Sequence, residues 1–350
     1  MSTPQTATTA HGRPLRSRPR LTTTAIVYLV LAGVIVVGAV LTATTGRSMF
    51  TPGNISAILT GTSALGFIAI GQTLVILGGS LDLSVPQVVS LSTLVAGVTM
   101  AGRDENLVVG ALAALAVCAV IGLINGLVVT VLRVHGFIAT LGMGLIISGY
   151  LGTNYQGSAG SAAYPLRVLG ATGIGPIPVS TLIMLGCAGL AALMLARTRT
   201  GHHLYAVGGQ RDVARLSGVR VGQPVVVAHV LCSVLAGMAG LLLLARLSVG
   251  SPTIGSQGGY DLMSIAAVVL GGTLLSGGRG TIAGTLGGVA IFAVMDNVMG
   301  AIQLNPFLRD VVRGLVIVLA VAVYARRSLI LRPPRFAATG APASEREVAA

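Results

Sequence analysis

Long apolar runs alternate with short polar or glycine-rich breaks along most of the chain. Because a bilayer core of about 30 Å is crossed by roughly 20 helical residues, such runs predict membrane helices. The six clearest runs are residues 22–44, 55–78, 107–131, 179–196, 223–245 and 281–302. Four further runs are shorter, richer in Gly or interrupted by charge: residues 84–101, 137–152, 260–276 and 306–325. The pattern predicts an all-α polytopic membrane protein with about 10 transmembrane helices, and a count from about eight to about eleven would also fit.

The composition supports a membrane location. Hydrophobic residues make up 53% of the 350 residues, charged residues only 9%, and the mean hydropathy is +0.89. A water-soluble globule of this size needs more charge on its surface. The formal net charge is +13, and all 22 basic residues are arginines. On a soluble chain this excess would suggest nucleic acid as a partner. Here the arginines cluster at the ends of the apolar runs, which favours membrane topology and no nucleic acid.

Several kinds of chemistry are disfavoured by the residues that the chain contains. Without a lysine, it lacks the residue that reaches the phosphates in a P-loop and the amine of a Schiff base. Cys118, Cys187 and Cys232 all lie within apolar runs, so we interpret them as packing residues. The five histidines are adjacent or isolated and show no metal-ligand spacing, and each is interpreted as a loop or packing residue. We expect no catalytic residues, no metal and no cofactor.

The arginines also predict the orientation, because cytoplasmic loops of membrane proteins carry an excess of positive charge. Arginines gather in the N-terminal tail, the C-terminal tail and one internal loop: Arg13, Arg16, Arg18, Arg20, Arg326, Arg327, Arg332, Arg335, Arg197, Arg199, Arg211, Arg215 and Arg220. The predicted outer loops hold only scattered arginines, and the longest, residues 153–178, consists mostly of small residues. An even number of helices places both termini in the cytoplasm. Residues 1–20 and 328–350 are expected to be cytoplasmic tails, the first of them disordered, on either side of a membrane domain spanning 21–327. The first apolar run is too long for the core of a cleaved signal peptide.

A short charged segment lies in the internal basic loop, where residues 205–220 read YAVGGQRDVARLSGVR. Gly208 and Gly209 are expected to break the preceding segment, and residues 210–217 can form about two helical turns that end at Gly218. Its small and apolar residues occupy one side and its charged residues the other. Such a helix suits docking into a groove on another protein. It would equally suit resting on anionic lipid headgroups, and composition does not separate the two.

Polar side chains inside apolar runs are costly and are therefore candidate functional residues. They are Asp82, Asn125, Asp261, Asp296 and Asn297. Each also has a structural interpretation. We expect Asp82 to cap the following helix and Asp261 to lie at a helix start. Asp296 is expected to pair with Arg309 or Arg313.

Two glycine-rich stretches resemble each other, LGGSLDLS at residues 77–84 and LGGTLLSG at residues 270–277. Glycine permits sharp turns and close helix approach, and broken helices occur where they line a cavity. The similarity hints at an internal repeat around a central site, although both pieces have the same orientation in the ten-helix prediction.

The segment DVARLSG, residues 212–218, resembles the EAA-type coupling loop of ABC importer permeases. The longer stretch LYAVGGQRDVARLSGVRV looks like the corresponding loop of the ribose-type sugar permeases, in the superfamily of branched-chain amino acid and ribose permeases. Residues 71–92, 122–143 and 258–288 carry the same resemblance, which spans most of 60–325. The sequence departs from the family pattern at four places: Pro86 replaces an expected Gly, His135 and Gly136 stand where Pro is common, Asp261 replaces Glu, and Ser264 stands where Asp is common.

The resemblance implies a type II-like ABC importer permease fold with a short cytoplasmic coupling helix in a loop at about 198–222. The residues implied in ATPase coupling are Tyr205, Gly208, Gly209, Arg211, Asp212, Ala214, Arg215, Leu216 and Gly218. The substrate pathway candidates are Asp82, Asn125, Phe137, Thr140, Asp261, Asp296 and Asn297. The implied function is import of a monosaccharide or related small polar solute through the bacterial plasma membrane.

Implied partners are a cytoplasmic ABC ATPase subunit, an extracytoplasmic solute-binding protein, a second permease copy in a homodimer, and membrane lipid. Branched-chain amino acid or nucleoside permeases are the nearest alternatives. An ion-coupled secondary transporter would instead use Asp82, Asp261 or Asp296 as its titrating group. A receptor-like membrane protein without transport is a third possibility.

Overall fold

The computed structural model of the chain describes residues 22–330. The N-terminal tail expected at 1–20 and residues 331–350 of the C-terminal tail lie outside the described residues. The last described helix continues to Ile330.

Every apolar run of the sequence forms a helix. The long helices are α1 (Thr23–Thr44), α2 (Pro52–Leu77), α3 (Val85–Met100), α4 (Leu107–Thr130), α5 (Gly136–Asn154), α7 (Val179–Arg197), α10 (Gly222–Leu247), α12 (Tyr260–Leu270), α13 (Ile282–Ala301) and α14 (Pro306–Ile330). Among the described residues, seven helices are long and apolar enough to cross a membrane. Helices α3 and α12, with 16 and 11 residues, are shorter than a full crossing. The protein is therefore an all-α polytopic membrane protein, and the count of about ten crossings stays a prediction.

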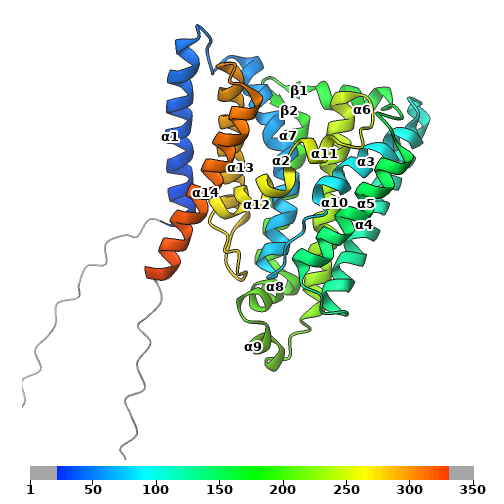
Figure 1. The fold of residues 1–350 in the computed structure, drawn as a ribbon, viewed down its shortest axis with the longest axis vertical. Helices are drawn as coiled ribbons and strands as arrows, with labels where there is room; N and C mark the ends of the chain where they lie inside the picture. Colours follow the sequence, from blue (N-terminus) through cyan, green and yellow to red (C-terminus); the bar gives the residue numbers. More distant parts are fainter. Residues whose placement is uncertain (1–21, 331–350) are drawn as a thin grey trace, which may run out of the picture.

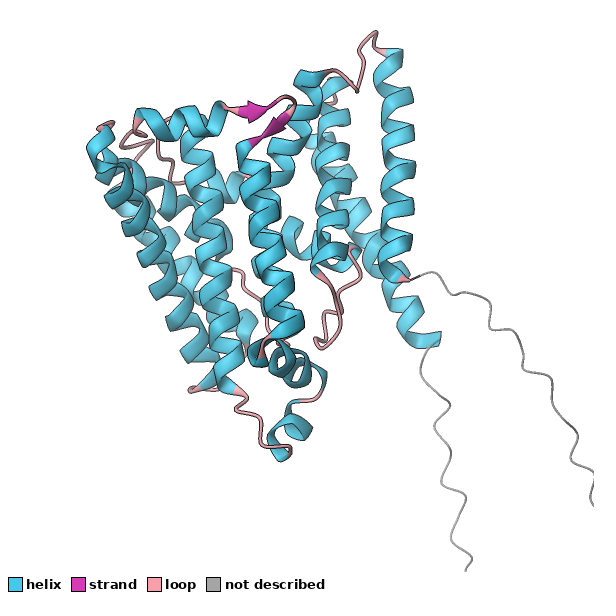
Figure 2. Ribbon diagram, turned by 180° about the vertical axis from the view of Figure 1, so that it is seen from behind, coloured by secondary structure: helices cyan, strands magenta, loops and turns pink. Residues whose placement is uncertain are grey.

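Smaller elements occupy the connections. They are η1 (Asp104–Asn106), α6 (Tyr164–Ala171), β1 (Gly173–Ile174), β2 (Ile177–Pro178), α8 (Arg199–Gly209), α9 (Arg211–Leu216) and α11 (Ile254–Gln257). Strands β1 and β2 pair antiparallel through a tight turn at Gly175, whose φ of +60° favours glycine. The loop expected at 153–178 thus contains a helix and a hairpin, which its small residues did not indicate. Figure 2 shows this hairpin at the end of the molecule opposite α8 and α9.

Helix α2 forms the centre of the bundle, and 83% of the residues in its most apolar 18-residue stretch are buried. It packs against α7, α10, α12 and α13, and α10 also packs against α3 and α4. In Figure 1, α1, α13 and α14 lie on one side of α2, whereas α3, α4 and α5 lie on the other. Helix α1 packs on α13, but only 11% of the residues in its most apolar 18-residue stretch are buried. Its apolar surface is thus left for lipid or for another membrane protein.

The two similar glycine stretches end their helices in the same way. Helix α2 ends at a turn in which Gly79 has φ of +75°, and α12 ends at a turn in which Gly272 has φ of +90°. In each turn an amide reaches back to a carbonyl five residues earlier, Ser80 N to Val75 O at 3.1 Å and Thr273 N to Val268 O at 3.2 Å. The run expected at 260–276 therefore stops at Leu270, because the glycine pair terminates the helix.

Candidate functional site

Helices α8 and α9 form a helical pair at one end of the bundle (Figure 1). The Thr198 side chain caps α8 by accepting a hydrogen bond from Gly201 N at 3.1 Å. The preceding helix, α8, ends at Gly209, as expected from the glycine pair. The next residue, Gln210, has an extended backbone with φ of −160°.

The predicted short helix is present as α9, two residues shorter than expected. The helix ends at Leu216, and Gly218 closes its C-terminal turn as predicted, with φ of +80° and its amide donated to Arg215 O at 3.0 Å. The coupling residues of the sequence analysis thus lie on two helices joined by an extended residue.

Helix α8 contacts the ends of two membrane segments. Gly208 packs directly on the carbonyl of Leu77, the last residue of α2, and that carbonyl accepts a hydrogen bond from Gly278 N at 3.0 Å. The Tyr205 hydroxyl donates to Gly280 O at 2.9 Å. Gly278 and Gly280 belong to the connection between α12 and α13. A displacement of α8 would therefore act on α2 and on this connection together.

The pKa of the Tyr205 hydroxyl is raised by burial, so the group stays a neutral donor at ordinary pH. A side chain added at Gly209, in contrast, would point into open space. The two adjacent glycines thus differ in what a substituent would meet.

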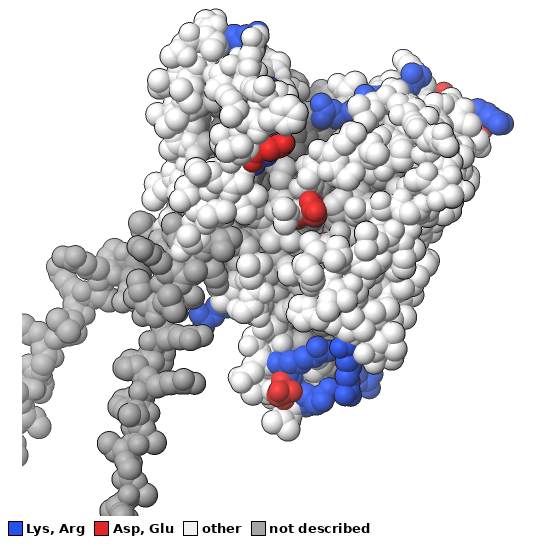
Figure 3. All heavy atoms as spheres, viewed as in Figure 1, with Lys and Arg blue, Asp and Glu red and all other residues white. Residues whose placement is uncertain are grey.

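Helix α9 is attached through one small side chain. Ala214 is buried and packs with apolar residues of α4, α8 and α10. Val213 and Leu216 point outward, and Leu216 is 88% exposed. The α9 surface, defined as Val213, Leu216, Arg211 and Arg215, is therefore apolar and basic together. In Figure 3, basic side chains gather at this end of the molecule beside a small acidic patch. Helix α9 also contains one acidic residue, Asp212.

The pathway candidates were expected to include Asp82 as a helix cap. Asp82 lies in the irregular segment 78–84 between α2 and α3 and is 1% exposed. Its Oδ1 accepts hydrogen bonds from Ser84 N at 2.9 Å and Ser84 Oγ at 2.6 Å. The N-cap residue of α3 is Ser84, so Asp82 stabilises the turn before the helix rather than capping it.

Side chains from three other helices hold this segment. Asn125 of α4 donates to Ser84 Oγ at 3.0 Å, and Thr140 Oγ1 of α5 accepts from Leu83 N at 2.9 Å. His229 of α10 lies with Nδ1 3.5 Å from Asp82 Oδ2 and with Nε2 3.1 Å from Ser80 Oγ. We call Ser80, Asp82, Ser84, Asn125, Thr140 and His229 the polar centre.

All members of the polar centre are buried, so in this conformation they hold the segment instead of lining an open path. His229 was interpreted as a packing residue from its sequence. Its place inside the apolar run 223–245 was the signal that could have identified it, because ionisable residues within membrane segments are costly.

The remaining pathway candidates lie outside the polar centre. Asp296 Oδ1 accepts from Arg313 Nε at 2.9 Å, which is one of the two expected pairs, whereas Arg309 bonds the Leu304 carbonyl. Asn297 donates to Asn54 Oδ1 at 2.9 Å. These two side chains thus connect α13 to α14 and to α2.

Asp261 lies in the first turn of α12, as expected, and is partly buried. Phe137 lies on α5 and is 44% exposed. The structure therefore brings Asp82, Asn125 and Thr140 together and leaves the other candidates at separate places.

Comparison with known proteins gives a consistent result. Residues 54–321 match the family described as branched-chain amino acid transport system / permease component. The chain is 40% identical over 285 residues to the ribose import permease protein RbsC of Escherichia coli (strain K12), covering 80% of this chain and 88% of that protein. It is 32% identical to the galactose/methyl galactoside import permease protein MglC of Haemophilus influenzae, covering 77% and 85% of the two chains. It is also 32% identical to the L-arabinose transport system permease protein AraH of Escherichia coli (strain K12), covering 74% and 78%.

Proposed function

Because the chain belongs to the family of branched-chain amino acid transport permease components, we propose that it is the permease subunit of an ATP-driven ABC importer for a monosaccharide or related small polar solute. A permease component forms a membrane pathway and is not an enzyme. The observation that carries the solute class is the similarity to permeases named for ribose, galactose and L-arabinose. ATP hydrolysis is assigned to a separate ABC ATPase subunit, and solute delivery to an extracytoplasmic binding protein.

Coupling is assigned to helices α8 and α9. The α9 surface offers an exposed leucine beside two arginines, a combination that suits a groove with an apolar floor and acidic rim on the ATPase. The Gly208 contact and the Tyr205 hydrogen bond connect α8 to the end of α2 and to the α12–α13 connection. Movement of the ATPase would then be transmitted to the helices around the polar centre.

The arrangement of arginines supports an orientation with α8 and α9 in the cytoplasm. The same end carries Arg133, Arg197, Arg199, Arg211, Arg215 and Arg220, whereas the hairpin end carries Arg47, Arg103, Arg167 and Arg246. With this orientation both termini are cytoplasmic, and residues 21–327 form the permease domain between two tails. A second copy of the chain completes the pathway in the bacterial inner membrane.

The test is ATP-dependent uptake of labelled ribose, galactose and L-arabinose into proteoliposomes that contain the ATPase and the binding protein. The variant Leu216→Glu places a charge on a side chain that is 88% exposed, so it leaves folding intact while opposing docking. Leu216→Met is the matched control, because it keeps an apolar side chain of similar size. We expect Leu216→Glu to abolish uptake and ATPase capture and Leu216→Met to retain both.

Three results would contradict this proposal. Uptake driven by a proton gradient without the ATPase would indicate an ion-coupled transporter. Transport of leucine or of nucleosides, with no sugar transported, would place the chain among the alternative permeases. Full activity of Leu216→Glu would show that α9 does not dock the ATPase.

A further inference from the structure

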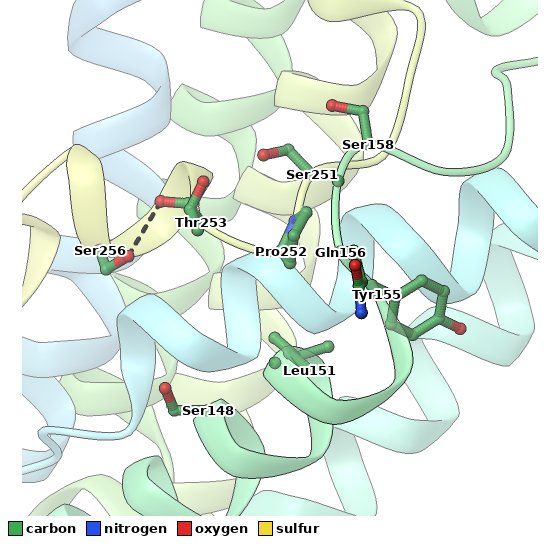
Figure 4. A pocket seen from close by; sticks show the side chains of 11 residues that line it. Ser148, Leu151, Tyr155, Gln156, Ser158, Ser251, Pro252, Thr253 and Ser256 are labelled. Carbon is green, nitrogen blue, oxygen red and sulfur yellow. Dashed lines mark hydrogen bonds between the residues drawn. The ribbon is translucent and has the colours of Figure 1, made fainter.

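A pocket of about 310 Å³ lies between α5, the segment that follows it and the segment around α11 (Figure 4). Its polar wall is formed mainly by hydroxyl and amide side chains, and a tyrosine ring and Leu151 complete it. The side chains used below are Ser148, Tyr155, Gln156, Ser251, Thr253 and Ser256. No residue that lines the pocket carries a charge. Its size falls at the lower end of small-molecule sites, which begin at about 300 Å³.

The pocket wall is held on α3 by a series of hydrogen bonds. Ser251 N donates to Thr93 Oγ1 at 3.0 Å, and Gly255 N donates to Ser90 Oγ at 3.0 Å. Ala159 and Gly250 exchange backbone hydrogen bonds of 2.9 and 3.1 Å, joining the two irregular segments. Because both segments are fixed, the pocket exists before any ligand arrives.

Polar groups in this pocket are free to meet a ligand. Thr253 precedes α11, but its side chain makes no capping hydrogen bond. The Ser256 hydroxyl donates to the Thr253 carbonyl at 2.9 Å, so its oxygen still accepts (Figure 4). Ser148, Thr253 and Ser256 are exposed. Irregular backbone within a membrane protein is stable only where protein or water meets its polar groups, and here the hydrogen bonds to α3 supply protein partners.

We propose that this pocket is a binding subsite for an uncharged, polyhydroxylated solute of monosaccharide size. The inference rests on the proposed function and specifies where on this chain the solute is held. Hydroxyl and amide groups can both donate to and accept from the hydroxyls of such a solute. The Tyr155 ring offers an apolar face for its C–H groups.

The absence of charge in the pocket separates solute classes. A free amino acid carries an ammonium and a carboxylate, and moving either out of water without a charged partner is costly. A neutral polyol loses only hydrogen bonds that the pocket can replace. The pocket therefore selects against amino acids, although the family is described by branched-chain amino acid transport.

The first test uses a property of the sequence, which contains no tryptophan. The variant Tyr155→Trp places a single tryptophan in the pocket wall. Tyr150→Trp places one on the same helix, on a side chain that is 54% exposed and does not line the pocket. The full chain in lipid nanodiscs is titrated with ribose, galactose, L-arabinose and leucine. For the tryptophan at position 155, we expect a saturable change in fluorescence with at least one sugar and no change with leucine. For the tryptophan at position 150, we expect no change with any of these solutes.

The second test keeps the tyrosine and removes one hydroxyl. Thr253→Val preserves the shape of a lining residue, and Thr153→Val does the same for an exposed threonine of α5 outside the pocket. Loss of one neutral hydrogen bond predicts about a two- to tenfold decrease in sugar uptake for Thr253→Val, and no decrease is expected for Thr153→Val.

Three results would overturn the proposal: no change in fluorescence at position 155, an equal change at position 150, or a change with leucine instead of sugar. So would equal uptake by the two threonine variants. These failures are distinct from failure of the proposed function, because ATP-dependent sugar uptake by the unsubstituted chain tests that function separately. A chain that imports sugar normally while both pocket tests fail refutes the pocket alone.

Discussion

The adjacent glycines at the end of α8 allow a sharp test of the proposed coupling. Gly208→Ala adds a methyl group where the Leu77 carbonyl and the Gly278 amide, 2.7 Å from the added atom, leave no room. Gly209→Ala adds the same methyl group with no atom within 4 Å. Neither glycine has a positive φ, so alanine is compatible with the backbone at both positions.

The structure sets the size of the expected difference. Overpacking a close contact costs about 1–3 kcal/mol, and leaving the Leu77 carbonyl without its partner costs about 1–3 kcal/mol more. Alanine regains up to about 1 kcal/mol of helix propensity at either position. Gly208→Ala should therefore destabilise the contact by about 1–5 kcal/mol, whereas Gly209→Ala should be neutral or slightly stabilising.

Two measurements check this prediction. Thermal unfolding of the purified permease should show a lower midpoint for Gly208→Ala only. ATP-dependent uptake with the ATPase and the binding protein present should fall for Gly208→Ala, because α8 no longer seats on α2. Retained uptake by Gly208→Ala at the level of Gly209→Ala would refute the argument that this contact transmits motion.

Two further predictions concern buried hydrogen-bonding groups. In the polar centre, His229→Ala should destabilise the protein by about 1–3 kcal/mol because it removes the ring that lies beside Asp82 Oδ2 and Ser80 Oγ and leaves both buried oxygens facing a void, and adding Asp82→Asn should recover part of that loss. Unfolding midpoints of the single and double variants measure this coupling, and strictly additive losses would contradict it. Tyr205→Phe removes the hydrogen bond to Gly280 and should cost about 1 kcal/mol. Because burial raises the pKa of Tyr205 above 10.0, its stabilisation should be present at neutral pH and decline above pH 10, so the unfolding midpoint should be more alkali-sensitive in the unsubstituted chain than in Tyr205→Phe.

The apolar runs predicted all of the long helices, because a chain with so few charges can satisfy its backbone in a bilayer only by forming helices. The glycine pairs at 78–79 and 271–272 are visible in the sequence, and the first correctly marked the end of α2. The second lay inside an expected helix and ended it early, because apolar composition alone does not reveal a backbone turn.

The candidate site was predictable in part. The position of α9 and the pairing of Asp296 with Arg313 followed from turn residues and from the cost of an unpaired charge. The contact between His229 and Asp82 did not, because the two residues are far apart in the chain and meet only where α10 crosses the segment 78–84.

The sequence by itself determined that this protein spans a membrane, where its long helices begin and which loop carries the basic helix, since all three depend on local composition. Only the tertiary structure decided that neighbouring residues of the same type have different surroundings. Gly208 and Gly209 are equivalent in sequence, yet a side chain at Gly208 would collide with the end of α2 and one at Gly209 would point into open space. The difference arises because these contacts join side chains and backbone from distant parts of the chain. A local sequence pattern does not specify that geometry.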